Sequence, residues 1–369
     1  MSRRAEIAGA GFAGLAAAAM LARRGWSVRV HEAADAPRSV GAGIYVYAFA
    51  QEVLRQIGAF ADFDAHAFAP TSRTIYVDGA ARSTTPTDGL YRTTTRAVLH
   101  RAVLDAARRA GVEVATRSRA VGAEAGGVLS LEDGRSLEAD LVVAADGVRA
   151  SVAHRLGLTI ARTQHQNGIT RVLLDRTGMR GPAWDGIRDY YDYRTRPLRV
   201  LYTPCGPDAF YFCLMAPSRD GQATRVPVEI ALWAEAFPAL APALGRIGPS
   251  GRHDRYTTTR LPRWSRGRVA VVGDAAHAMP SSLGQGAGVS MLNAVRMAEA
   301  VDAAEDVEAG LAGWEASLRP VVEQWQREAE GVSRRRSLGE AVHPGGDLPG
   351  ERPGDLPPIP SPIPLETAP

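Results

Sequence analysis

The stretch RAEIAGAGFAGLAAAAM, residues 4–20, decides the fold of this chain. Its start, Arg4–Ala8, predicts a buried strand, and the alanine-rich segment Phe12–Arg24 predicts a helix. Between them, Gly9 permits a tight turn, Gly11 lets the backbone approach a pyrophosphate, and Gly14 lets helix and strand pack closely. The helix N-terminus then offers free N–H groups to phosphates.

A second strand and a terminal acid complete this pattern. Ser27–His31 predicts the strand, and Glu32 follows at its end, where a carboxylate would accept a hydrogen bond from a ribose hydroxyl. The loop and the acid do not separate FAD from NAD, but a carboxylate here would repel the 2′-phosphate of NADP. A glycine-rich turn with a surface glutamate is the alternative interpretation. The order of the elements favours dinucleotide binding.

Composition narrows the function further. The chain has 369 residues, 45% hydrophobic and 22% charged, which is enough for two or three domains with a large core. A net charge of +3 is too small for a nucleic-acid surface. The sequence contains no lysine, which excludes Schiff-base and P-loop lysine chemistry. Cys205 and Cys213 have neither zinc-ligand nor C-x-x-C spacing, so we expect no metal site and no disulfide framework.

We expect no targeting signal in the N-terminal segment. The stretch from Ala5 to Ala22 lacks a basic start and a cleavage site, and it is too rich in glycine and small residues for a spanning helix. We therefore expect a protein of the reducing cytoplasm without a membrane or nucleic-acid partner. A monomer or a dimer is compatible with the sequence.

Alternating strand and helix patterns predict an α/β fold. Further helices are expected over Arg96–Ala110 and from Leu292 to about Ala341, and further strands over Val112–Thr116, Leu141–Ala145 and Val269–Val272, with a hairpin formed by Val128–Leu131 and Leu137–Ala139. From Asn167 to about Leu214, aromatic and β-branched alternation predicts a second, antiparallel sheet.

These patterns suggest a Rossmann-like domain into which a β-sheet domain is inserted. The Rossmann-like domain would comprise residues 1–70, 96–160 and 263–342, the last with C-terminal helices, and the inserted domain residues 71–95 and 161–262. The tail, residues 343–369, holds nine of the 24 prolines, so we expect it to be disordered or to lie over the surface.

Two more glycine-and-acid turns follow predicted buried strands. The segment DLVVAADGVR, residues 140–149, ends its strand at Asp146-Gly147. The segment GRVAVVGDAAHAMP, residues 267–280, ends its strand at Gly273-Asp274 and continues through Gly284-Gln-Gly-Ala-Gly288 into a helix. Asp146 as a plain turn residue and Asp274 as a helix N-cap are the alternative interpretations. His277 is expected to be structural.

In this order the three motifs resemble the fingerprint of the FAD-dependent aromatic-ring monooxygenases of the para-hydroxybenzoate-hydroxylase type, over about residues 3 to 335. The stretches GAGIYVY, LYTPCGPDAFYFCLMAP and VGDAAHAMPSSLGQGAG are most similar to family members that oxygenate hydroxypyridine carboxylates. The resemblance implies an FAD-binding domain with an inserted substrate domain. In detail the chain departs from the family pattern at Gly288 and Asn293.

The resemblance also implies a set of FAD-binding residues. Glu32 would hold the adenosine ribose, Arg96 the linker of the cofactor, and Asp274 the ribityl or pyrophosphate region. A helix N-terminus at Gly286–Val289 would stabilise negative charge on reduced flavin through backbone N–H groups. The predicted cofactor residues are Gly9, Gly11, Phe12, Ala13, Gly14, Glu32, Arg38, Arg96, Asp146, Asp274, Pro280, Gly284, Gly286, Ala287 and Gly288.

The resemblance implies a substrate pocket on the second sheet as well. Positions that match the pocket of the hydroxypyridine oxygenases carry Tyr45, Ser72, Arg171, Arg199, Tyr211 and Tyr256. Arginine can bind both oxygens of a carboxylate, and tyrosine can hold a ring hydroxyl or ring nitrogen. Surface arginines and core tyrosines are the alternatives. Tyr45, Arg199 and Tyr211 are the predicted catalytic residues, acting by orientation because no histidine falls in the set.

The expected function is a monooxygenase that consumes NADH or NADPH and acts through a flavin C4a-hydroperoxide. The substrate class would be a hydroxylated aromatic or N-heteroaromatic carboxylate, hydroxylated or opened at the ring. The single G-x-G-x-x-G implies that the nicotinamide binds only transiently. Alternatives are an oxidase or reductase without oxygen insertion and a non-catalytic FAD-binding protein. A flavin-dependent halogenase is disfavoured because that family depends on a lysine, which this chain lacks.

Overall fold

A computed structural model of the chain describes residues 2–37, 41–149, 151–249 and 251–337. Three predictions lie outside this range: the cofactor contact of Arg38, the end of the last helix near Ala341, and the conformation of the tail, residues 343–369. Within the described residues, no helix combines the length and the apolar character needed to cross a bilayer.

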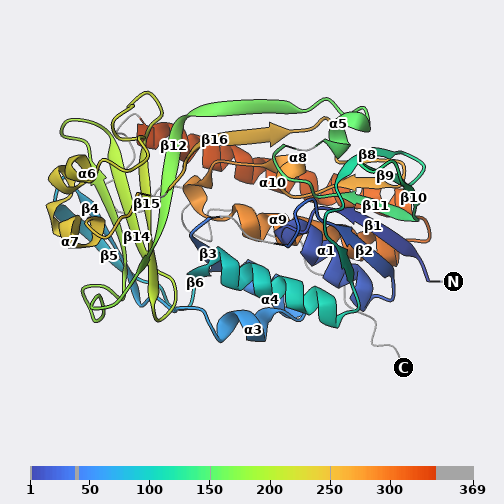
Figure 1. Cartoon of the computed structure of the whole chain (residues 1–369), viewed down its shortest axis with the longest axis horizontal. Coiled ribbons are helices and arrows are strands. Elements are labelled where there is room, and N and C mark those ends of the chain that lie inside the picture. Colours follow the sequence, from blue (N-terminus) through green and yellow to red (C-terminus); the bar gives the residue numbers. More distant parts are fainter. Residues whose placement is uncertain (1, 38–40, 150, 250, 338–369) are drawn as a thin grey trace.

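A six-stranded sheet forms one end of the molecule, in the order β17-β18-β11-β1-β2-β7 (Figure 1). All neighbours are parallel except β17 and β18. The strands are β1 (Arg4–Ala8), β2 (Ser27–His31), β7 (Glu113–Ala115), β11 (Leu141–Ala144), β17 (Ser265–Arg266) and β18 (Val269–Val271). The carboxyl ends of β1, β11 and β18 therefore bring the three predicted motifs to one edge of the sheet. The α/β prediction is confirmed, with strand limits within one or two residues.

Helices cover this sheet. Residues 12–21 of α1 are all buried, because α1 packs against the sheet and against α4 and α9. The helices are α1 (Phe12–Arg23), α2 (Ala48–Gln56), α3 (Phe60–Asp64), α4 (Arg96–Arg109), α5 (Val152–Arg155), α8 (Asp274–His277), α9 (Gly286–Ala303) and α10 (Val307–Ser337). The helix expected from Leu292 is two helices, since Asp306 accepts a hydrogen bond from the N–H of Ala309 at 3.0 Å and starts a new one.

The second sheet has seven strands in the order β16-β12-β15-β14-β13-β4-β5 and stands at the other end of the molecule (Figure 1). Its strands are β4 (Ser72–Val77), β5 (Ala80–Pro86), β12 (Ala161–Asp175), β13 (Ile187–Asp192), β14 (Leu198–Pro204), β15 (Ala209–Pro217) and β16 (His253–Arg260). The prediction of a purely antiparallel sheet is wrong at one pair, because β4 and β13 run parallel.

Short helices cover one face of this second sheet, although its sequence gave no helical prediction. They are α6 (Ile230–Ala236), η1 (Pro238–Leu240) and α7 (Ala241–Leu244). Trp233 and Phe237 pack there in one apolar cluster with Phe210 and Phe212 of β15. The other face of the sheet is thereby left to form the wall of an interior space.

Smaller elements join the two ends. The ribbon of β3 (Gly43–Tyr47) and β6 (Tyr91–Thr95) leads into α4, and the long strand β12 runs beside β16 from the second sheet toward α5 (Figure 1). A three-stranded sheet of β8 (Ala120–Glu124), β9 (Val128–Leu131) and β10 (Ser136–Glu138) contains the predicted hairpin.

Candidate functional site

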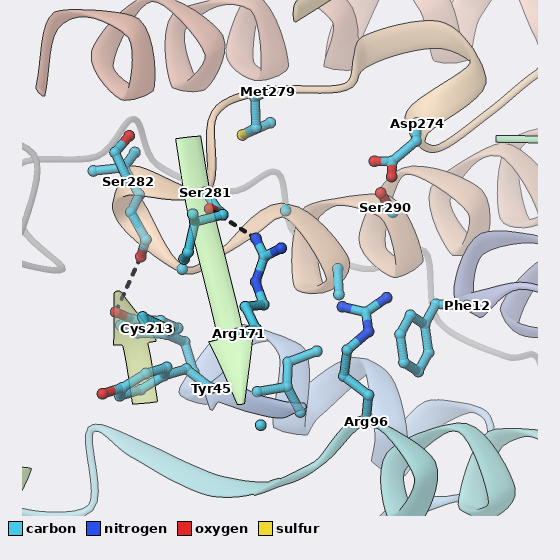
Figure 2. Close-up of a pocket in the computed structure, with 18 of the residues that line it drawn as sticks. Phe12, Tyr45, Arg96, Arg171, Cys213, Asp274, Met279, Ser281, Ser282 and Ser290 are labelled. Carbon is cyan, nitrogen blue, oxygen red and sulfur yellow. Dashed lines mark hydrogen bonds between the residues drawn. The ribbon is translucent and has the colours of Figure 1, made fainter. Parts of the chain in front are cut away.

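A cavity of about 480 Å³ lies between the two sheets, and all three predicted motifs reach it. Figure 2 shows residues of the first and third motifs around this space, with Arg171 and Tyr45 on the side of the second sheet. The predicted residues that line it are Gly11, Phe12, Ala13, Tyr45, Arg96, Arg171, Arg199, Tyr211, Asp274, Gly284, Gly286 and Ala287. Segments far apart in the sequence thus converge on one site.

The glycines of the first motif fit a dinucleotide. Gly9 has a φ of +101°, and a Cβ there would lie 2.5 Å from the carbonyl oxygen of Ala145. A Cβ on Gly14 would lie 2.0 Å from the carbonyl oxygen of Gly9, so helix and turn touch. Gly11 and Gly286 instead border the cavity, and a Cβ on either would meet no protein atom within 4 Å. The turn therefore packs tightly against the protein at Gly9 and Gly14 and leaves open space on the cavity side at Gly11, as a pyrophosphate-binding loop requires.

The three acids of the motifs differ in their contacts. Glu32 accepts hydrogen bonds from the N–H groups of Ala10 at 3.0 Å and Ala34 at 2.9 Å, which fixes the glycine loop to the end of β2. Asp146 accepts hydrogen bonds from the N–H groups of Ser151 and Val152 and so caps α5. Asp274 faces the cavity at the start of α8, where Gly273 is the N-cap, so the N-cap interpretation of Asp274 does not hold.

Other members of the cofactor set lie behind the cavity wall. Gly288 packs on α2, where a Cβ would lie 3.0 Å from Ala50 and Phe49, so this glycine serves helix packing. The Asn293 side chain accepts a hydrogen bond from the N–H of Gly273 at 3.3 Å and ties α9 to the third motif. Pro280 is buried next to the lining residues Met279 and Ser281.

His277 is structural in this arrangement, as predicted. It is 1% exposed and packs on Trp264 with ring centroids 5.2 Å apart. Burial lowers the pKa of the His277 imidazole, which therefore stays neutral. It is not among the described residues that line the cavity.

Aromatic rings from β3, β6 and β15 line one side of the cavity. The Tyr211 ring lies directly over Gly43, since a Cβ on Gly43 would be 1.7 Å from its Cδ1. The hydroxyl groups of Tyr45 and Thr203 are 2.6 Å apart, and Tyr45 contacts Tyr91 edge-on at 5.3 Å. Burial raises the pKa of both Tyr45 and Tyr211 well above 10, so their hydroxyls stay protonated. They can position a ring but are poor bases.

The predicted arginines already have protein partners. Nε and Nη2 of Arg199 donate to the two oxygens of Asp189 at 2.7 and 2.8 Å, and its Nη1 donates to the Met215 sulfur at 3.3 Å. Arg171 donates through Nη1 to Asp254 at 3.4 Å and through Nη2 to Ser281 at 3.0 Å, a contact drawn in Figure 2. These contacts disfavour the expectation that both arginines offer free forks to a substrate carboxylate.

Asp189 is the central acid of this wall, and sequence reasoning missed it. It is fully buried, and it also accepts hydrogen bonds from Arg73 at 2.6 Å and from the Tyr191 hydroxyl at 3.2 Å. Burial alone would raise the pKa of Asp189, but the charges of Arg199 and Arg73 hold it well below its usual value. The available signal was an acid next to the two tyrosines of the strand IRDYYD, since a buried charge requires a partner.

Two predicted pocket residues lie elsewhere. Ser72 is not among the described residues that line the cavity, whereas its neighbour Arg73 is. Successive side chains of a strand point to opposite faces, so a shift of one position in β4 explains the difference. Tyr256 borders a smaller second cavity, which shares Arg199, Met215 and Ser282 with the first. Arg336 of α10 also lines this second cavity and donates to the carbonyl of Ser282 at 2.8 Å.

Arg96, on the cofactor side, faces the same cavity as Arg171. Arg96 lies over the Phe12 ring at 4.9 Å, and Figure 2 shows its guanidinium directed into the cavity beside that of Arg171. Burial and the nearby charge of Arg171 lower the pKa of Arg96. Two neighbouring cations in a partly buried space favour an anionic ligand between them, such as a phosphate of the cofactor.

The sequence matches a family model described as "FAD binding domain" over residues 4–329. The 2-heptyl-3-hydroxy-4(1H)-quinolone synthase of Mycobacteroides abscessus is 41% identical over 340 residues, which cover 88% of each chain. The 6-hydroxynicotinate 3-monooxygenase of Bordetella bronchiseptica is 28% identical over 80% of this chain and 81% of its own. A crystal structure of 2-methyl-3-hydroxypyridine-5-carboxylic acid oxygenase superposes with a TM-score of 0.89, at 37% identity and 95% coverage of both chains.

Proposed function

Since this chain belongs to the family of FAD-dependent aromatic monooxygenases, we propose that it uses NADH or NADPH and O₂ to hydroxylate a small N-heteroaromatic ring that carries a hydroxyl or oxo group. The observation that carries the proposal is the single cavity lined by all three FAD motifs on one side and by an aromatic and arginine wall on the other. The relatives with quinolone, nicotinate and pyridine names support a nitrogen-containing ring.

Bound FAD would accept a hydride from the nicotinamide and, once reduced, activate O₂ for transfer to the substrate. The residues present fit this cofactor: the open faces of Gly11 and Gly286 leave room for it, and Arg96 and Asp274 border that space. The N–H groups at the start of α9 would stabilise negative charge on the reduced ring. The single G-x-G-x-x-G motif supports a reductant that binds only transiently.

The wall formed by the second sheet and the β3–β6 ribbon would hold the substrate in place. Tyr45 and Tyr211 can pack against the ring, and their protonated hydroxyls can donate to a ring oxygen. His100 is the one imidazole among the described lining residues, and its Nε2 already lies 2.8 Å from the Ala10 carbonyl oxygen. Catalysis by the protein would therefore consist of orientation, exclusion of water and hydrogen bonding.

The test is the product formed from O₂ enriched in oxygen-18. Purified holoenzyme is supplied with NADH or NADPH and with hydroxypyridines or 4-hydroxyquinolines, and we expect ring-stimulated oxidation of the nicotinamide and one labelled oxygen atom in the product. Product mass distinguishes hydroxylation from ring opening. Oxidation of the ring without label would instead support an oxidase or reductase, and a colourless protein that binds no FAD would contradict the proposal altogether.

A further inference from the structure

We propose that Asp189 determines substrate choice in this cavity by occupying Arg199, so that the site prefers a ring with a single oxo or hydroxyl oxygen over a ring carboxylate. The inference deepens the proposed function and rests on it for the class of ligand. The pair of donors formed by Nε and Nη2 of Arg199 is occupied by a carboxylate of the protein itself.

The geometry of Arg199 carries the argument. A guanidinium binds a carboxylate best through two parallel N–H groups. In Arg199 the pair formed by Nε and Nη2 is bound to the two oxygens of Asp189, and Nη1 faces the Met215 sulfur. A substrate carboxylate would have to compete for Arg199 with Asp189, which is fully buried. Asp189 is also held in place by hydrogen bonds from Arg73 and from the Tyr191 hydroxyl.

The second arginine of the wall, Arg171, also contacts an acid of the protein, but through a single nitrogen. One Nη of Arg171 contacts Asp254 and the other contacts Ser281. Each arginine expected to bind the substrate acid therefore meets an acid of the protein. Because Arg171 and Arg199 each contact an acid of the protein, their presence in the wall does not by itself indicate an acidic substrate.

The experiment uses matched ligands that differ only by a carboxylate. Holoenzyme is titrated with 4-hydroxyquinoline and with 4-hydroxyquinoline-2-carboxylic acid, and separately with 3-hydroxypyridine and 5-hydroxypyridine-3-carboxylic acid, and Kd is measured from the change in flavin absorbance. We expect the parent protein to bind the non-acid of each pair about tenfold more tightly or better.

Asp189→Asn removes the competing carboxylate while keeping its shape. We expect this variant to shift the ratio of the two Kd values toward the acids by about tenfold or more. Asp192→Asn is the matched control: it makes the same replacement on the same strand, where Asp192 pairs with Arg194 instead, and it should leave the ratio unchanged.

A double variant covers the case in which Asp189→Asn does not fold. Asp189→Asn with Arg73→Gln keeps the net charge of the group, because one carboxylate and one guanidinium leave together, and it still frees Arg199. A gain in acid binding by this variant supports the geometric argument. A parent that prefers the acids, or a ratio unchanged in both Asp189 variants, overturns the role of Asp189 while the monooxygenase proposal stands. Failure of all four rings to bind overturns both.

Discussion

Gly43 offers a sharp test of the cavity wall, because the Tyr211 ring rests on it. A Cβ at Gly43 would lie 1.7, 2.1 and 2.6 Å from Cδ1, Cε1 and Cγ of that ring. To restore an ordinary carbon contact of roughly 3.5–4.0 Å, the ring must withdraw by about 2 Å. Gly43→Ala should therefore move Tyr211 without straining the backbone, since Gly43 is in an extended strand.

The expected cost follows from overpacking in a buried site. Such insertions cost about 1–3 kcal/mol. If the displaced ring narrows the substrate side of the cavity, the cost appears in ligand binding as a Kd raised about 5- to 140-fold, at about 1.4 kcal/mol per factor of ten. FAD content should stay that of the parent, because the glycine loop of the first motif is not touched. Flavin absorbance titrations with 4-hydroxyquinoline measure the first effect, and the ratio of flavin to protein absorbance measures the second.

Two control variants accompany this measurement. Gly126→Ala adds the same methyl group where no atom lies within 4 Å, so it should change Kd less than about twofold. In a Tyr211→Ala background the added methyl finds room, and Gly43→Ala should then cost almost nothing. A Gly43→Ala protein that binds ring ligands and melts as the parent does would show that Tyr211 does not lie over β3.

The remaining predictions concern the cofactor loop and stability. Gly11→Ala should keep the fold and lose FAD affinity, because its Cβ would fill the open face of the loop. Gly14→Ala should lower the melting temperature as well, because its Cβ would clash with the Gly9 carbonyl. Flavin content and thermal melting curves distinguish the two variants. Gly313→Ala in α10 should stabilise the protein by about 0.5–1 kcal/mol. Gly310→Ala in the same helix should destabilise it, because its Cβ would lie 2.7 Å from the Val301 Cα. Equal shifts in the melting temperatures of the two variants would contradict this difference. Burial would raise the pKa of Glu6, but hydrogen bonds from His31 and Arg4 hold it below 4.5, so the ionised group stabilises the fold above pH 4.5 and this contribution is lost as the pH falls. Glu6→Gln should therefore flatten the acid side of the stability curve, and an unchanged urea-denaturation profile below pH 5 would count against that linkage.

The part of the fold that the sequence predicted depends on local rules. The turn at Gly9 needs a positive φ, and the strands before the second and third motifs are continuous apolar runs. The elements that converge on the cofactor side could therefore be recognised within one or two residues. The break between α9 and α10 was missed because one capping residue, Asp306, produces it within an otherwise helical pattern.

The substrate wall was harder to predict, because its contacts join distant segments. Strand periodicity tells which residues share a face, but it does not tell that Asp189 of β13 binds Arg199 of β14 and Arg73 of β4. Ser72 was predicted to line the cavity in place of Arg73 for a related reason: an error of one position in β4 moves a side chain to the other face of the sheet. Residue type alone therefore identified the arginines but not their partners.

The guanidinium-rich cavity has a consequence for how the enzyme would respond to acidity. Despite burial, the charge of Asp189 raises the pKa of both Arg73 and Arg199 above the usual arginine value, so both keep their protons across the whole range in which proteins stay folded. Burial raises the pKa of the Cys213 thiol to about 11. These walls present a constant electric field to the reacting ring between mildly acidic and mildly basic conditions. Inflections in a pH–rate profile would thus report on the flavin or the bound heterocycle, so the kinetics would follow the chemistry of the reaction directly.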